Sequence, residues 1–205
     1  MRCLAPLRRA DMDILSYLAE HFDLPILDWI AAHLWCPFLD AIMPIITLLG
    51  DAGIFWIVMA VVLLCIPKTR KIGLGMGAAL LIGLLVCNVT LKPLVARIRP
   101  YDYKLEHFGV TIKLLIEAQH DFSFPSGHTI ASFEAATVLM IHNKKAGIPA
   151  LILASLIAFS RLYLYVHYPT DVLTSIVLGI GIGFLGNWLV KKGFQMYENR
   201  RQLKK

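Results

Sequence analysis

Long apolar runs are the feature that most restricts how this chain can fold. Hydrophobic residues make up 58% of the sequence and charged residues only 17%, whereas roughly a quarter of an ordinary soluble domain is charged. A helix of about 20 apolar residues crosses the hydrocarbon core of a bilayer. The sequence therefore predicts an all-α integral-membrane bundle of six transmembrane helices. The expected spans are residues 26–49, 53–67, 72–91, 128–142, 147–166 and 171–190.

The first of these runs is interrupted by two acidic residues and two prolines, which leaves open whether it forms a full span. Three segments are expected along the chain: a cytoplasmic or interfacial segment at 1–25, a membrane domain at 26–190 and a basic cytoplasmic tail at 191–205. Residues 12–23 have the pattern of an amphipathic helix lying on the membrane surface. Acidic residues follow the basic amino terminus closely, which argues against a cleaved signal peptide.

The basic residues of the loops predict the orientation, because Lys and Arg accumulate on the cytoplasmic side of short connections. Such residues cluster at 68–71, at 144–145 and in the tail from Lys191 onward. Six spans would place these clusters and the amino terminus together in the cytoplasm. The GDAG turn (residues 50–53), the long segment 92–127 and the turn at 167–170 would then face outward.

Several functions are disfavoured by the composition. A net charge of +6 could suggest a nucleic-acid partner, but the basic residues form short clusters between apolar runs, without an aromatic-lined basic stripe. The cysteines show no metal-site or redox spacing and are interpreted as packing residues; they are Cys3, Cys36, Cys65 and Cys87. Gly179 and Gly183 form a GxxxG pair, which favours packing within one subunit over a dimer interface. The oligomeric state stays open.

Three separated clusters of polar residues fall on the predicted outer face. They are KPLVARIRP (92–100), PSGH (125–128) and SRLYLYVHYPTD (160–171). Together they supply three or four cations, two histidines, a hydroxyl, a glycine turn and one carboxylate. Such a collection suits a tetrahedral oxyanion.

Each residue of these clusters also has an ordinary explanation. Lys92 and Arg99 offer a point charge and a planar donor fork for phosphate, but either alone could be a snorkelling residue at the interface. The same two explanations stay open for Arg97. Gly127 and Ser126 could form an anion-binding helix start, or simply a helix cap.

The third cluster contains a candidate nucleophile. Pro169 lies between His167 and Asp171, so the chain is expected to turn after the histidine and to start a new helix near the carboxylate. Asp171 can then reach back to one ring nitrogen and leave the other free to attack phosphorus. Asp171 also suits the N-cap of that helix, and the two roles are compatible.

The three clusters resemble the signature motifs K-x6-RP, PSGH and SR-x5-H-x3-D of the type 2 phosphatidic acid phosphatase superfamily, and every motif residue is present. The resemblance extends in span pattern over about residues 26–190. It implies an acid phosphatase/haloperoxidase-like core and a lipid phosphate or diphosphate as substrate. It also implies that no metal or other cofactor is required.

The resemblance assigns a role to each matching residue. His167 would be the nucleophile that forms a phosphohistidine, Asp171 would orient it, and His128 would protonate the leaving oxygen. The phosphoryl group would be bound by Lys92, Arg99, Ser126, Gly127 and Arg161. The residues themselves agree with the absence of metal, because the clusters contain one carboxylate and no set suited to two divalent ions.

Two further expectations concern residues around the clusters. Glu134 lies about two turns beyond His128 inside an apolar run, and an acid inside a membrane is a candidate for function; we interpret it as a buried hydrogen-bonding residue or as part of a wet cavity. Residues 101–127 are expected to cover the site in part, with a short interfacial helix at 111–118.

The sequence leaves the lipid open. An outward-facing site favours undecaprenyl diphosphate, with phosphatidylglycerol phosphate and phosphatidic acid as alternatives. An anion transporter is a rival of another class, but a nucleophile, an acid and an orienting carboxylate in order argue against it. Vanadium haloperoxidase chemistry is a third possibility, although those relatives are not expected to have such apolar spans.

Overall fold

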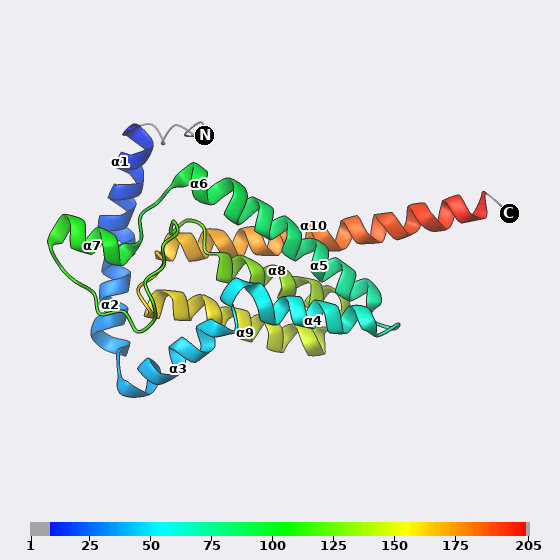
Figure 1. The fold of residues 1–205 in the computed structure, drawn as a ribbon, viewed down its shortest axis with the longest axis horizontal. Helices are drawn as coiled ribbons and strands as arrows, with labels where there is room; N and C mark the ends of the chain where they lie inside the picture. Colours follow the sequence, from blue (N-terminus) through cyan, green and yellow to red (C-terminus); the bar gives the residue numbers. More distant parts are fainter. Residues whose placement is uncertain (1–8, 204–205) are drawn as a thin grey trace.

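The computed structural model describes residues 9–203, and all regular secondary structure in that range is helical. Figure 1 shows the order of the helices along the chain. In sequence they are α1 (Arg9–Leu18), the π-helical turn η1 (Ala19–Asp23), α2 (Leu24–Leu34), α3 (Pro37–Leu48), the short turn η2 (Asp51–Gly53), α4 (Ile54–Cys65), α5 (Arg70–Leu84), the π-helical turn η3 (Leu85–Leu91), α6 (Lys92–Val95), α7 (Pro100–Phe108), α8 (Gly127–His142), α9 (Lys144–Tyr163) and α10 (Pro169–Gln202).

The core of the molecule is a bundle of α4, α5, α8, α9 and α10, which lie side by side (Figure 1). Helix α8 is central, since it contacts α5, α9 and α10 and most of its residues are buried. Small side chains on α8, such as Ser132, Ala135 and Ala136, are completely buried and let the neighbouring helices approach closely. The outer helices expose large apolar side chains instead, as Val58 on α4 and Val177 on α10 do. A bundle that is apolar on its outside suits a lipid environment.

The glycine pair of α10 packs within the chain. A Cβ added at Gly179 would lie 2.9 Å from the carbonyl oxygen of Ile130, and one at Gly183 would lie 2.7 Å from the carbonyl oxygen of Glu134. Both partners belong to α8, so the GxxxG pair allows α10 to lie directly against the central helix. The intramolecular interpretation of this pattern agrees with the structure.

Six separate spans are not confirmed. In the part of the chain that the structure describes, three helical stretches are long and apolar enough to cross a membrane, Arg70–Phe108, Lys144–Tyr163 and Pro169–Gln202. A fourth candidate joins Pro37–Leu48 and Asp51–Cys65, which are bent by 40° at their junction. The run 26–49 is not one span, because extended backbone at Trp35 and Cys36 divides it into α2 and α3. Pro37 occupies the first turn of α3, where proline is tolerated.

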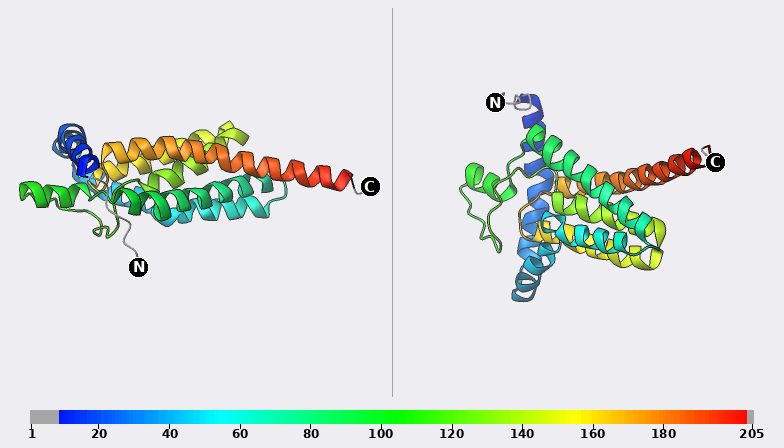
Figure 2. Two further views of the ribbon diagram at one scale, coloured as in Figure 1. Left: turned by 90° about the horizontal axis from the view of Figure 1, so that it is seen from above. Right: turned by 45° about the vertical axis from the view of Figure 1, so that its right-hand side comes forward.

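Helices α1 and α2 run across one end of the bundle, roughly perpendicular to its long axis (Figure 2). A helix in this position would lie along a membrane surface if the bundle crosses the membrane, as the pattern of residues 12–23 predicts. The described part of the chain thus begins at the end of the bundle where α7 lies and finishes at the opposite end, with α10 (Figure 1). An even number of crossings would have brought these two ends together.

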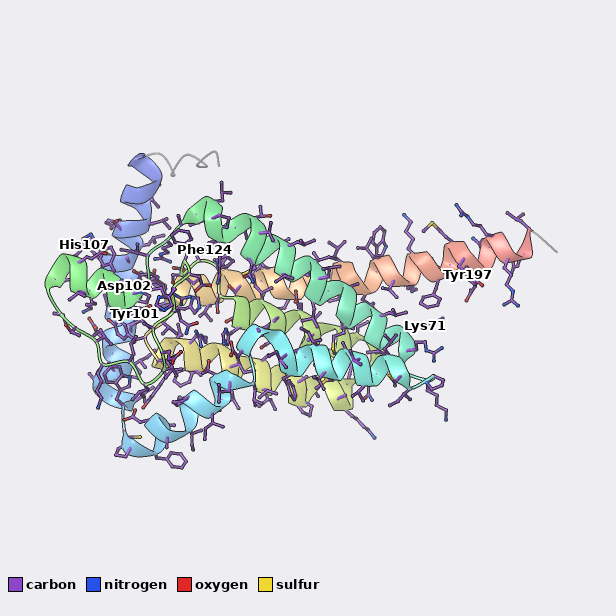
Figure 3. The ribbon with its side chains drawn as sticks, in the orientation of Figure 1. Lys71, Tyr101, Asp102, His107, Phe124 and Tyr197 are labelled. Atoms are coloured by element: carbon purple, nitrogen blue, oxygen red, sulfur yellow. The ribbon has the colours of Figure 1, made fainter. Side chains whose placement is uncertain are left out.

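The segment between α7 and α8 crosses the same end of the bundle, but the helix expected at 111–118 is absent. Gly109, in the left-handed conformation, ends α7. Beyond it Ile112, Leu114 and Ile116 pack onto the tyrosine-rich core of this end, while the residues between them are exposed. A period of two is typical of extended backbone, so this segment is an extended loop and not a helix. Residues 109–126 are called the strap below. Figure 3 shows Tyr101, Asp102, His107 and Phe124 at this end and Lys71 at the other.

Candidate active site

The three motif clusters meet at the end of the bundle beside α7. There they line one end of a cavity of about 800 Å³. The motif side chains on its wall are those of Lys92, Arg99, His128, Arg161 and His167, together with Gly127. Three cations and two imidazoles from three separate stretches of the chain therefore face one space.

Lys92 and Arg99 share a carboxylate that the motifs do not include. Lys92 begins α6 and Arg99 lies in extended backbone just before α7; both form ion pairs with Asp121 of the strap. Partial burial raises the pKa of Asp121, but the hydrogen bond from Lys92 and the charge of Arg99 outweigh it and lower that pKa to about 2. Asp121 is therefore an anion in the position where a phosphoryl group would meet the two cations.

Arg99 also reaches the candidate nucleophile. Its guanidinium donates to the carbonyl oxygen of Val166 at 2.7 Å and lies 3.4 Å from Nε2 of His167. Burial, followed by the charges of Arg99 and Arg161, holds the pKa of His167 well below its ordinary value. This shift favours the neutral imidazole, which is the form that a nucleophile requires.

Arg161, in the last turn of α9, supplies the third cation. It is 1% exposed, donates to Oγ1 of Thr47 at 2.6 Å and lies 3.4 Å from Nε2 of His128. Its Nε and Nη2 groups have no hydrogen-bond partner among the described residues. Because buried donors are normally satisfied, these groups are available to an anion in the cavity.

The PSGH turn begins α8. Ser126 occupies the N-cap position, its N–H donates to Oγ of Ser175 at 2.8 Å, and its own Oγ accepts from Thr129 at 2.9 Å. No side chain caps the first turn of α8, so its free N–H groups can face an anion. Gly127 needs no unusual backbone here, since an added Cβ would meet its nearest neighbours at 3.7 Å.

His167 and Asp171 are close but do not form a hydrogen bond of normal length. Nδ1 of His167 lies 3.6 Å from Oδ2 of Asp171 and has no partner within residues 9–203. Asp171 is fully buried and accepts hydrogen bonds from Arg97, Ser123 and the N–H of Tyr168. A small shift of the ring would complete the bond expected from the sequence. The N-cap residue of α10 is Tyr168, not Asp171. Asp171 is the third helical residue and contributes to the cap by accepting the N–H of Tyr168.

Within residues 9–203, left-handed backbone occurs at three residues other than glycine, Ala52, Ala96 and Tyr165. Ala52 lies in the GDAG turn against α8, Ala96 between Lys92 and Arg99, and Tyr165 between Arg161 and His167. This conformation costs about 1–2 kcal/mol per residue relative to ordinary helical backbone. Ala96 and Tyr165 thus lie in turns that carry motif residues, and backbone strain at such places is typical of a functional site.

The deeper part of the cavity is apolar. It continues between α4, α5 and α8, past Ala60, Leu64, Leu81 and Leu84, to Glu134. Glu134 is 1% exposed, and its Oε2 has no partner in the described part of the chain. A Cβ at Gly83 would lie 2.2 Å from that oxygen, so the glycine makes room for the carboxyl. Of the two interpretations of Glu134, a cavity-lining group fits better than a hydrogen-bonded one.

A model of the PAP2 superfamily matches residues 72–195, well over half of the chain. The chain belongs to the PAP2 superfamily. The matched range contains all three motif clusters and the helices that carry them, from α5 to most of α10.

Curated PAP2 relatives include the undecaprenyl-diphosphatase of Sulfolobus acidocaldarius, 36% identical over 132 residues, and the undecaprenyl-diphosphatase BcrC of Bacillus subtilis, 36% identical over 133 residues. Each alignment covers 63% of this chain and, in turn, 61% and 63% of the relatives. The chain therefore aligns with less than two thirds of their length.

Solved structures extend the likeness beyond the matched range. The transmembrane PAP2-type phosphatidylglycerolphosphate phosphatase of Bacillus subtilis superposes with a TM-score of 0.64 at 26% identity, over 89% of this chain and 95% of that one. A bacterial vanadium-dependent iodoperoxidase superposes with a TM-score of 0.58 at 18% identity, over 69% of this chain and 42% of that one. The second comparison supports the haloperoxidase-like fold of the core and nothing further.

Three polar residues that belong to none of the motifs also lie around this PAP2 site. Asp121 and Ser123 belong to the strap just before PSGH, and Asp23 belongs to the amino-terminal helix. The first two could have been suspected as polar residues next to a motif. Asp23 carries no such signal, because it lies in an ordinary amphipathic pattern outside the matched range. Arg97, for which two roles stayed open, is buried against both Asp23 and Asp171.

Groups of three or more His, Cys, Asp or Glu side chains that could hold a metal ion are absent from the part of the chain that the structure describes. Cations of the protein itself face the cavity.

Proposed function

We propose that this PAP2 protein is a membrane-bound lipid phosphatase, and that it converts undecaprenyl diphosphate to undecaprenyl phosphate. The proposal rests on one observation: Lys92, Arg99 and Arg161 meet two histidines at one end of a cavity whose deeper wall is mostly apolar. The names of the two curated relatives support the choice of lipid.

Phosphoryl transfer requires mainly electrostatic stabilisation, because negative charge spreads over three equatorial oxygens while the attacking and leaving atoms stay in line. Lys92 and Arg99 would bind these oxygens after Asp121 gives way. Arg161 would use its unpaired Nε and Nη2 groups. The first turn of α8 at Ser126 and Gly127 would add N–H donors. This set performs the role that divalent ions have in other phosphatases.

Hydrolysis would proceed in two displacements at phosphorus. The lone pair on Nε2 of His167 forms a bond to phosphorus as the bond to the leaving oxygen breaks, and His128 donates a proton to that oxygen. Asp171 stabilises the positive charge on the ring through Nδ1. Water then attacks the phosphohistidine, His128 accepts its proton, and inorganic phosphate and free His167 result.

The apolar part of the cavity offers a place for the start of the lipid chain. It is lined by α4, α5 and α8 below the cations, so a headgroup at the site and a hydrocarbon chain between helices could be bound together. The strap and α7 would cover the headgroup from the aqueous side.

The site would face outward. Lys71 lies at the end of the bundle opposite the site (Figure 3). The basic residues at 144–145 come directly after α8, and those beyond 191 lie in the last part of α10, so both groups lie toward the same end as Lys71 (Figure 1). By the distribution of positive charge, that end is cytoplasmic. The tail is then cytoplasmic, whereas α1 and α2 lie at the extracytoplasmic surface rather than in the cytoplasm as the charges alone predict.

A second candidate substrate is phosphatidylglycerol phosphate, since the phosphatase with that name superposes over 89% of this chain. The motifs hold only the phosphoryl group and do not separate the two lipids.

The test is phosphate release by purified protein from undecaprenyl diphosphate, phosphatidylglycerol phosphate and phosphatidic acid, with His167→Ala as the control for a contaminating phosphatase. We expect the highest kcat/KM for the diphosphate, activity that persists in excess chelator, and inhibition by orthovanadate. A preference for phosphatidylglycerol phosphate would select the second candidate. Release that is equal in His167→Ala, or that requires added magnesium, would contradict the mechanism.

A further inference from the structure

A buried guanidinium bridges two buried carboxylates beneath the candidate nucleophile. Arg97 donates from Nη2 to Oδ2 of Asp23 and from Nη1 to Oδ1 of Asp171, each at 2.6 Å. Both carboxylates are 0% exposed and Arg97 is 6% exposed. Its guanidinium also stacks on the Tyr168 ring, 3.7 Å from the ring centre. Because Arg97 is buried and paired with two carboxylates, it is not a snorkelling residue.

Asp23 belongs to a part of the chain that the family model does not match. It ends η1, the π-helical turn between α1 and α2, and π-turns inside helices often occur at functional sites. Oδ1 of Asp23 accepts a hydrogen bond from the N–H of Thr170 at 2.9 Å, and Oδ2 accepts one from the Thr170 hydroxyl at 2.8 Å. The amino-terminal helix is thereby joined to the first turn of α10, one residue before Asp171.

The charges of this cluster have a consequence for His167. A single guanidinium beside Asp171 would form a neutral pair and weaken the field of the carboxylate at the imidazole. Asp23 shares the same guanidinium, so the three groups together keep one negative charge. The oxygen of Asp171 that faces Nδ1 of His167 is the one that Arg97 does not hold.

We propose that Asp23, acting through Arg97, is a positioning residue for catalysis: it fixes Asp171 and preserves its negative charge toward His167. The inference rests on the proposed function, in which His167 is the nucleophile. It adds the amino-terminal helix to the catalytic apparatus as the element that completes the orientation of the carboxylate.

Asp28, in the adjoining helix α2, provides a charge-matched control. It accepts hydrogen bonds from Tyr165 at 2.7 Å and from Lys104 at 2.7 Å, so it also links α2 to the end of the bundle that holds the site. Among the described residues it forms no hydrogen bond or ion pair with Arg97 or Asp171. Asp23→Asn and Asp28→Asn each remove one negative charge while keeping the shape of the side chain.

The experiment compares kcat, KM and the rate of phosphoenzyme formation in a single turnover for the wild type and both variants, with p-nitrophenyl phosphate and with the best lipid substrate. We expect Asp23→Asn to lower kcat and the phosphorylation rate by about 10- to 100-fold, as outer partners of reacting groups commonly do, while KM changes less than about twofold. Asp28→Asn should keep kcat within about twofold, whatever its effect on the melting temperature.

A double-mutant comparison provides the second measurement. If Asp23 acts through Asp171, Asp23→Asn should cause no further loss of phosphorylation rate in an Asp171→Asn background. Additive losses of phosphorylation rate, or equal kcat for Asp23→Asn and Asp28→Asn, would mean that Asp23 only holds the helices together, and would overturn the proposal. If instead no phosphate ester is turned over by the wild type, the proposed function fails first, so the two failures are distinguishable.

Discussion

At the scale of single residues, the site is a set of positive charges placed before any substrate arrives. Arg99 and Arg161 are almost completely buried, and burying a charge is costly unless it is paired. The ion pair with Asp121 meets this need for Arg99 in the free protein. Arg161 keeps donors without a partner in the described residues. An incoming phosphoryl group would accept hydrogen bonds from these donors of Arg161, which favours its binding.

The two histidines should respond differently to alanine substitution. His167→Ala removes the nucleophile and should abolish turnover of every substrate. His128→Ala should lose about 10² to 10⁴-fold on phosphatidic acid, whose leaving alkoxide needs a proton. A lipid diphosphate should suffer less, because its leaving group is a phosphate monoester with a second pKa of about 6.

Burst kinetics with an aryl phosphate separate the chemical steps, since in the proposed mechanism His128 would also act as the base when the phosphohistidine is hydrolysed. Equal losses for both variants on all substrates, even in the burst phase, would show that the roles are assigned wrongly. The same conclusion would follow if His128→Ala alone removed the covalent phosphoenzyme.

Asp121 should compete with phosphate for Lys92 and Arg99. Asp121→Asn should lower the inhibition constants of inorganic phosphate and vanadate by roughly two- to fivefold, the equivalent of about 0.4–1 kcal/mol for an ion pair with one half-exposed partner. Glu117→Gln, in the same strap, is the control for loss of one negative charge. Weaker phosphate binding in Asp121→Asn would instead make Asp121 an organiser of the two cations.

The pH dependence of this effect follows from the sign of the shift. The pKa of Asp121 in the folded protein is about 2, below the ordinary value near 3.9. The ion pair is therefore complete above about pH 4 and is lost only as the pH falls through 2. The difference in inhibition constants between Asp121→Asn and the wild type should stay constant from pH 5 to pH 9, apart from the titration of phosphate itself.

At the scale of helices, close approach at glycine decides how tightly the bundle packs. A Cβ at Gly147 of α9 would lie 2.3 Å from Cα of Met140, whereas one at Gly77 of α5 would meet nothing within 4 Å. A methyl group at position 147 would push the backbones of α8 and α9 apart where the two helices meet. A methyl group at position 77 meets no neighbour, so only the intrinsic preference of helices for alanine over glycine remains.

Gly147→Ala should therefore destabilise the protein by about 1–3 kcal/mol, the usual effect of overpacking. Gly77→Ala should be neutral or stabilise it by up to about 1 kcal/mol. Unfolding of both variants in the same detergent, followed by circular dichroism, checks the difference. A melting temperature for Gly147→Ala equal to that of Gly77→Ala would mean that the hairpin opens at little cost.

The sequence predicts most helices of the bundle and all of the motif residues that the cavity brings together, but not everything that supports them. The α-helical pattern is strong where apolar runs are long, as in α9 and α10. It fails at 26–49, where Pro37 starts a second helix, and at 111–118, where an alternating pattern forms a strap. Asp23 and Asp121 act through tertiary contacts to Arg97 and Arg99, and such contacts leave no periodic signal in the chain.

At the scale of the whole molecule, the site lies at one end of the bundle and the basic tail at the other. Helices α1 and α2 share the end of the site, and α3 with α4 forms one bent element rather than two antiparallel spans (Figures 1 and 2). The proposed outward-facing site then places the amino-terminal helix outside and the tail inside. Six antiparallel spans would place both inside, so the two arrangements make opposite predictions for one measurable residue.

Tyr17 is that residue, because its side chain is 62% exposed on α1. In a background whose cysteines are replaced by serine or alanine, Tyr17→Cys should react in intact cells with a thiol reagent that does not cross the membrane. Phe108→Cys, 54% exposed at the end of α7, should react likewise. Lys145→Cys should react only after the cells are opened, because residue 145 lies just after α8, at the end of the bundle whose basic residues predict a cytoplasmic location. Protection of Tyr17→Cys with reaction of Phe108→Cys would restore the arrangement of six spans, and reaction of Lys145→Cys alone would place the site in the cytoplasm. Phosphate release by each variant shows that the labelled protein is folded.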